Sequence, residues 1–229
     1  MPYTISQHRK DFEIRTNELR KASSIAQRDA NVPAVIRDLV FQCCILQTSA
    51  AIEEYIRSVF DGWAFKVRNS AQSFASIPMR TRAAIAKERL LPHFLGYNYT
   101  SDEKVLLQKL EGEADIWPML QGVAPITATF EGRTIFDSRK YPSEKNMKVL
   151  FARIGIDNPF DQMASVMKAD AELRLTGFNS IRTALAHSNP PQLTHLDVKR
   201  EVLNMQSIVR AVDRVLHRHL TRQCGVSAW

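Results

Sequence analysis

An apolar stripe with helical spacing runs from about residue 33 to residue 63, and it constrains the fold more than any other feature of the sequence. Its apolar positions include Phe41, Ile45, Ile52, Tyr55, Ile56, Val59 and Phe60. A helix with one face in water carries a narrower stripe, so we expect this segment to be a central helix that forms the core. Asn31 and Pro33 have the positions of an N-cap and an early-helix proline. The sequence therefore predicts a fold built around one long helix.

The rest of the chain also shows helical periodicity. The other predicted helices span residues 5–28, 78–91, 101–111, 144–155, 162–187 and 195–221. Pro92 is expected to stop the helix before it, and Ser143 to cap the helix after it. Thr194 and Asp197 form a pattern like a capping box at the start of the final helix. The buried face of that helix is expected to consist of Val202, Met205, Val209, Val212 and Leu216.

The middle of the chain is less regular than its two ends. Residues 112–142 contain three prolines, and within them residues 128–136 (ATFEGRTIF) alternate in a way that is compatible with a small β-hairpin. No internal repeat or low-complexity run is present. We therefore expect one all-α domain over residues 1–229, a helical bundle with an irregular insertion over residues 62–142 between its core helices.

Charge and cysteine content narrow the function. The chain has 31 Lys and Arg against 24 Asp and Glu, a net charge of +7 that suits a polyanionic partner. Three cysteines, two of them adjacent, cannot make a disulfide framework or a thiolate zinc site, and a reduced, cytoplasmic setting is expected. No run approaches about 18 consecutive apolar residues, and the first residues are polar with mixed charge. We therefore expect neither a membrane span nor a signal peptide.

None of the common catalytic motifs is present. The sequence has no GxGxxG, GxxxxGK[ST], HExxH, CxxC or GxSxG pattern. His217 and His219 are two residues apart, so on a helix they point in different directions and do not share a metal. The expected chemistry is therefore that of side chains without a metal or cofactor, or simple binding.

Arg182 and His187 stand five residues apart near the end of a predicted helix. In that helix Phe178, Ile181 and Leu185 form an apolar stripe, with the arginine at its edge. The helix is expected to end at the SNPP run, because the residue before a proline avoids the helical region. The histidine then falls in the last turn, where the helix dipole stabilises a cation. Two cationic groups beside a helix end are suited to binding a phosphate.

The run RTALAHS around these two residues resembles the signature of the HEPN superfamily, an Arg followed a few residues later by a His. It departs from the usual RNxIAHG-like context at Thr183, where Asn is usual, and at Ser188, where Gly is common. Residues 46–57 (LQTSAAIEEYIR) and 141–160 (YPSEKNMKVLFARIGIDNPF) are also similar to segments of the larger RiboL-PSP-type HEPN nucleases.

This resemblance, which extends over residues 33–60 and 141–220, implies both a fold and an activity. It implies an HEPN-like helical bundle that acts as a metal-independent ribonuclease. It also implies a homodimer, in which two Arg–His motifs face each other across a two-fold axis and line one cleft. Arg182 would bind the scissile phosphate and stabilise the charge that develops on it. His187 would transfer a proton during attack by the 2′-hydroxyl, which leaves a 2′,3′-cyclic phosphate and a 5′-hydroxyl.

Each of these residues also has a purely structural alternative. The stem of Arg182 would cover apolar surface, and His187 would hydrogen-bond the last carbonyls of its helix. Asn179 and Thr183, on the same flank, would either polarise the cleft or cap the interface between two copies.

Glu53 lies at the margin of the long helix's apolar stripe, whereas Glu54 points away from it. A half-buried carboxylate at this position would orient the Arg–His pair as a supporting residue. The alternative is an i,i+4 ion pair with Arg57, which would contribute only a few tenths of a kcal/mol.

A row of arginines recurs at i,i+4 spacing on the predicted final helix, namely Arg210, Arg214, Arg218 and Arg222. Like charges at this spacing repel, so the row is either a track for an RNA backbone or a face that is solvated or paired with acidic neighbours. Arg214 and His219 also repeat the Arg-x4-His spacing. They lack the small flanking residues and the proline stop found near Arg182, so the first pair is favoured.

The resemblance to HEPN nucleases thus implies an endoribonuclease of the toxin or phage-defence kind. The partners that it implies are RNA, a second copy of the chain, and an antitoxin or another defence protein. One alternative is a non-catalytic HEPN-like module that binds nucleic acid or nucleotide, which the departure at Thr183 keeps open. Another is a helical subunit that only binds a protein partner.

Overall fold

The chain folds into α-helices throughout the part that the computed structural model describes, which is residues 2–70, 73–126, 132, 141–187 and 190–223. In order they are α1 (Gln7–Arg28), α2 (Ala34–Ser70), a 3₁₀ turn η1 (Phe74–Ser76), α3 (Met79–Thr100), α4 (Glu103–Glu111), α5 (Ile116–Gln121), α7 (Glu144–Arg153), α8 (Pro159–Met167), α9 (Ala171–Leu185) and α10 (His195–Gln223). These residues include no β-strand, so the all-α prediction is confirmed. The predicted hairpin at 128–136 lies outside the described residues except for residue 132.

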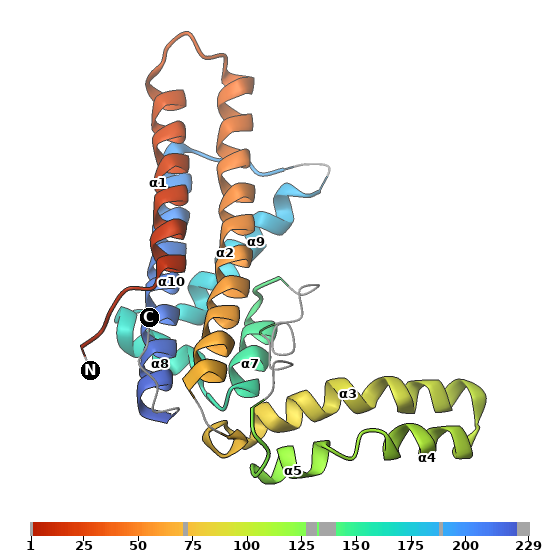
Figure 1. Ribbon diagram of the computed structural model, residues 1–229. Helices are drawn as coiled ribbons and strands as arrows, with labels where there is room; N and C mark the ends of the chain where they lie inside the picture. Colours follow the sequence, from red (N-terminus) through yellow and green to blue (C-terminus); the bar gives the residue numbers. More distant parts are fainter. Residues whose placement is uncertain (1, 71–72, 127–131, 133–140, 188–189, 224–229) are drawn as a thin grey trace.

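Three long helices, α1, α2 and α10, form the centre of the molecule (Figure 1). Each of them packs against the other two. All seven apolar positions of the predicted central helix are buried in α2. The stripe continues through Trp63 and Val67, which are fully buried, and for this reason α2 extends beyond residue 63 to Ser70. The prediction of a core-forming central helix is therefore confirmed.

The start of α10 has the predicted capping box. The Thr194 hydroxyl accepts a hydrogen bond from the Asp197 N–H at 3.2 Å, and the Asp197 carboxylate accepts one from the Thr194 N–H at 3.0 Å. The five residues predicted for its buried face have no exposed surface. The Tyr55 hydroxyl of α2 donates to the Val209 carbonyl at 3.3 Å, so a polar contact also joins these two core helices.

Three shorter helices, α7, α8 and α9, pack together beside the bundle, with α8 and α9 against α10. The prediction of a single helix over residues 162–187 is wrong. Lys168 has a left-handed backbone (φ 56°) that ends α8, and the Asp170 carboxylate then caps α9 by accepting from the Leu173 N–H at 2.9 Å. Because both helices bury residues in the same core, the apolar periodicity continues across the break.

Helices α3, α4 and α5 form an arm that projects from the bundle (Figure 1). The expectation that Pro92 ends its helix is wrong, because α3 continues through this residue to Thr100. A proline inside a helix leaves the carbonyl four residues earlier, here that of Glu88, without its hydrogen bond. Glu88 and Pro92 are both exposed, so water can satisfy this carbonyl.

By length and composition alone, α2 is the one helix in the described part of the chain that could cross a membrane. Its most apolar window has a mean hydropathy of 1.4. The core helix of a water-soluble protein has the same property, and one face of the second half of α2 is buried in the bundle.

His217 and His219 face different neighbours in α10, as their spacing predicts. The His217 ring lies 5.1 Å from that of Tyr3, and the His219 ring lies 5.9 Å from that of Trp63. Neither ring nitrogen of His219 has a hydrogen-bond partner among the described residues. Burial lowers the pKa of His219 from 6.5 to about 4, since a buried imidazolium loses its hydration. The folded protein therefore holds this ring neutral.

This buried ring makes stability depend on pH. The pKa of His219 is lower in the folded than in the unfolded chain, so its contribution is complete above about pH 6.5 and is lost as the pH falls toward 4. We expect wild-type protein to lose about 2–3 kcal/mol more than a His219→Phe variant between about pH 7 and pH 4.5. Denaturant unfolding at both pH values measures this. Equal losses in the two proteins would contradict the assignment.

Candidate functional site

Arg182 lies near the end of α9, at the junction with α2 and with the segment that precedes α7. Its neighbours Phe178, Ile181 and Leu185 pack into the core as predicted, the first of them fully buried. The Arg182 side chain remains 34 % exposed. The guanidinium group is thus held at the edge of the core and still reaches solvent.

Two groups from other parts of the chain contact this guanidinium. The Arg182 Cζ atom lies 4.6 Å from the centre of the Tyr141 ring, a cation–π contact. A terminal nitrogen of Arg182 lies 4.0 Å from a carboxylate oxygen of Glu53 in α2. At this distance and exposure the ion pair is weak, so most of the five N–H donors of the guanidinium remain available to a ligand.

Glu53 therefore faces α9 and does not form the alternative ion pair within its own helix. Arg57, the residue of the alternative i,i+4 pair, forms its ion pair with Glu54. The only other polar contact of the Glu53 carboxylate among the described residues is a long one, 3.5 Å from the Ser49 hydroxyl. The structure thus brings Glu53 and Arg182 together from segments more than a hundred residues apart.

Asn179 positions the ring on which Arg182 stacks. Its side-chain amide donates to the Pro142 carbonyl at 3.1 Å, and the Asn146 amide donates to the Tyr141 carbonyl at 2.8 Å. These two bonds tie the segment before α7 to α9 and to α7. The sequence does not single out Tyr141 as a site residue; its place in the 141–160 run that resembles the HEPN nucleases is the only signal for it.

His187 lies two residues beyond the last residue of α9 and is exposed. Its N–H donates to the Ala184 carbonyl at 3.2 Å, so the chain keeps one further tight turn past the helix. Along the helix axis it lies roughly 8 Å beyond Arg182. Thr183 is exposed, and its side chain makes no hydrogen bond within the described part of the chain. Ser188 lies outside the described residues.

The arginines of α10 are placed elsewhere. Arg210 pairs with Glu13 of α1 at 2.8 Å, and the Arg214 guanidinium lies 5.0 Å from the centre of the Tyr3 ring. Arg218 and Arg222 are exposed. Among the described residues, no contact joins this row to Arg182 or His187. The sequence leaves this row as either a track for an RNA backbone or a face that is solvated or paired with acidic neighbours. Arg210 is paired with an acidic neighbour.

The second Arg-x4-His pair does not form a common surface. Arg214 is exposed, whereas His219 is only 4 % exposed and packs on Trp63. In the first pair, by contrast, both side chains reach solvent. Both side chains of the first pair are therefore accessible to a ligand, although no contact among the described residues joins Arg182 to His187.

An exposed apolar stripe on α2 leads to Glu53. Val35, Leu39 and Leu46 are 69 %, 55 % and 43 % exposed, and Ala50 is also exposed. These positions recur on one helix face, and Glu53 is five full turns from Val35 on that same face. The first half of α2 extends beyond the shorter helices (Figure 1), and these side chains are exposed. Gln42 interrupts the stripe between Leu39 and Leu46, and Leu46 and Ala50 connect it to the candidate site.

Within the described ranges, no three His, Cys, Asp or Glu side chains come together as ligands for a metal ion. Comparisons with family models, with curated proteins and with solved structures found no match to this chain. The candidate site therefore rests on the geometry of its own residues.

Proposed function

We propose that this protein is a metal-independent endoribonuclease of the HEPN type, with Arg182 and His187 as its catalytic residues. The observation that carries the proposal is the Arg182 guanidinium, which is stacked on Tyr141, faces Glu53 and still reaches solvent. A half-exposed cation held from two sides is suited to bind a phosphate in a defined orientation. The proposed setting is a cytoplasmic toxin or phage-defence system, with an antitoxin or another defence protein as a further partner.

The proposed reaction needs one cation and one group that exchanges protons. The 2′-oxygen of the RNA attacks the adjacent phosphorus, and the bond from phosphorus to the 5′-oxygen of the next nucleotide breaks. Arg182 stabilises the negative charge that develops on the phosphate oxygens. His187 takes the proton from the 2′-hydroxyl or supplies one to the leaving 5′-oxygen. The products are a 2′,3′-cyclic phosphate and a 5′-hydroxyl.

Glu53, Tyr141 and Asn179 act in this proposal as positioning residues. The ring of Tyr141 fixes the plane of the guanidinium, and Asn179 fixes the segment that carries the ring. Glu53 draws the guanidinium toward α2 without saturating its donors. Thr183 touches none of these groups within the described part of the chain, so we assign it to the rim of the cleft.

The exposed stripe of α2 supports the homodimer in the proposal. Soluble monomers rarely leave a contiguous apolar face in water, and a two-fold interface uses the same face of both copies. Because Val35, Leu39 and Leu46 share a face with Glu53, pairing of two α2 helices through this stripe would place both candidate sites beside the interface. The two Arg–His pairs would then line one cleft.

A substitution that places a negative charge on the exposed stripe of α2 tests the proposed dimer and its activity. We expect wild-type protein to run as a dimer and to cleave single-stranded RNA with a chelator present. A Leu39→Asp variant places two carboxylates at the two-fold interface, so dimer affinity and cleavage should each fall about tenfold or more. Leu107→Asp on α4 is the matched control, because Leu107 is 57 % exposed against 55 % for Leu39. Light scattering and a cleavage assay measure both effects.

The control variant should keep wild-type dimer affinity and activity. A wild-type protein that stays monomeric, or that leaves RNA intact at every concentration, would contradict the proposal.

A further inference from the structure

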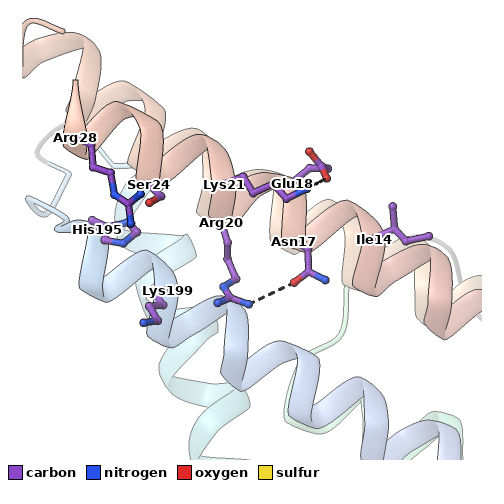
Figure 2. A pocket seen from close by; sticks show the side chains of 9 residues that line it. All are labelled: Ile14, Asn17, Glu18, Arg20, Lys21, Ser24, Arg28, His195 and Lys199. Carbon is purple, nitrogen blue, oxygen red and sulfur yellow. Dashed lines mark hydrogen bonds and ion pairs between the residues drawn. The ribbon is translucent and has the colours of Figure 1, made fainter. Parts of the chain in front are cut away.

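A cleft of about 630 Å³ lies between α1 and the first turns of α10, and its lining is dominated by cations. Four Lys or Arg side chains line it, against a single carboxylate, that of Glu18. In Figure 2 Arg28 lies beside His195 at one end, and Arg20 reaches from α1 toward α10 near Lys199. The two helices therefore direct positive charge into one space.

Little within the molecule neutralises this charge. Glu18 pairs with Lys21 at 2.7 Å and so leaves the other cations without a carboxylate. Arg28 and Lys199 form no ion pair with any described residue. Arg20 contacts only the Asn17 amide oxygen, at 3.3 Å, and its buried Nε atom has no hydrogen-bond partner among the described residues.

A cluster of this kind favours an anionic ligand. Its like charges repel one another, although solvent screens this repulsion because Lys21, Arg28 and Lys199 are exposed. A buried guanidinium donor without a partner adds the free energy of its lost hydration. An anionic ligand would remove both costs. The Nδ1 atom of His195 lies 2.8 Å from the Ser23 hydroxyl, and this contact fixes the imidazole ring at the wall of the cleft.

We propose that this cleft binds the phosphate backbone of single-stranded RNA. The cations that line the cleft on α1 extend from Arg20 to Arg28, roughly 12 Å by helical rise, so they follow a line and do not converge on one point. An extended row matches successive phosphates better than the single phosphate group of a small molecule. No Phe, Tyr or Trp side chain lines the cleft, so it lacks the usual platform for stacking a base and should bind without sequence preference.

The choice of RNA as the ligand rests on the proposed function, but the cleft is separate from the catalytic residues, since neither Arg182 nor His187 lines it. The two regions are close in the chain, however. His187 and His195 are eight residues apart, a distance of at most about 29 Å when fully extended.

The test measures the affinity for a labelled oligouridylate by fluorescence anisotropy at several salt concentrations. An Arg182→Ala background slows cleavage enough to keep the oligomer intact during the measurement, and the failure of the nuclease proposal would leave this readout unchanged. We expect Arg20→Gln/Lys199→Gln to bind about 10- to 30-fold more weakly at about 0.1 M salt and to lower the slope of log affinity against log salt by about 1.4. Lys104→Gln/Lys109→Gln on α4 removes the same charge from an exposed helix and serves as the control.

Arg28→Gln is a milder second variant at an exposed position, with an expected loss of about fivefold. A loss in the cleft variants but not in the control supports the proposal. Equal affinity in all variants, or equal losses in cleft and control variants, would overturn it. So would binding of uridine triphosphate as tight as that of the oligomer, because the cleft would then be a mononucleotide site.

Discussion

Replacing His187 by alanine is expected to lower the rate of RNA cleavage by about 10²- to 10⁴-fold, the usual contribution of a positioned general acid or base. Folding stability should stay within about 0.5 kcal/mol of wild type, because the side chain is exposed and its helix ends two residues earlier. His187→Gln should lose as much activity as His187→Ala, since an amide can hydrogen-bond but cannot exchange the proton. Single-turnover cleavage of a labelled RNA, together with denaturant unfolding, measures the two quantities.

His93→Ala is a suitable control for this substitution. His93 lies on the α3 arm and contacts Glu113 at 3.3 Å, outside the contacts that hold Arg182. Its removal should leave cleavage within about twofold of wild type. If His187→Ala and His93→Ala cleave equally well, His187 has no part in the reaction.

Replacing Asp213 by alanine should destabilise the protein by about 3–4 kcal/mol. Asp213 is fully buried in α10 and accepts hydrogen bonds from the Tyr3 hydroxyl at 2.6 Å and from the Ser6 N–H at 3.3 Å, as well as from the Ser6 hydroxyl. The network reaches Arg9, which donates to the Tyr3 hydroxyl at 2.8 Å. Alanine would leave the Tyr3 hydroxyl and both Ser6 donors without their acceptor in a largely buried network.

The same network raises the pKa of Tyr3 to about 12, first through burial and then through its hydrogen bond to Asp213. Denaturant unfolding at neutral pH measures the loss of stability. Asp102→Ala is the control, because this exposed carboxylate only caps α4 and its removal should cost about 1 kcal/mol. A loss below about 1 kcal/mol for Asp213→Ala would show that the N-terminal segment contributes little to the fold.

The central helices could be predicted from the sequence because the burial of one apolar face determines them. Residues of α2 and α10 that share a face are buried by neighbours along almost the whole helix, so the apolar period of each sequence matches its structure. The capping box at Thr194 is equally local, since it depends on residues three apart.

The ends of some helices were harder to predict. A proline does not always end a helix, and a continuous apolar pattern does not always belong to a single helix. Pro92 is tolerated inside α3, where the freed carbonyl reaches water. The turn at Lys168 interrupts a continuous apolar pattern, because α8 and α9 both face the same core. The local sign of that turn was Asp170, an N-cap residue inside the predicted helix.

The candidate site was predictable only in part, because its contacts are tertiary. The Arg182–His187 spacing can be read from one helix, and Glu53 from the edge of another. The Tyr141 ring and the Asn179 bond that positions it depend on where an irregular segment returns to α9. The basic cleft combines residues of α1 and α10 that are far apart in the sequence, so no local pattern indicates it.

The chemistry of the RNA ends tests the central claim most directly. Purified wild-type and Arg182→Ala protein are incubated with mixed cellular RNA in the presence of a chelator, and the ends of the fragments are identified. The wild-type protein should produce 2′,3′-cyclic phosphate and 5′-hydroxyl ends, and Arg182→Ala should produce them about 10²- to 10³-fold more slowly. Intact RNA with the wild-type protein, equal cleavage by both proteins, or 5′-phosphate ends would contradict a ribonuclease site built on Arg182 and His187.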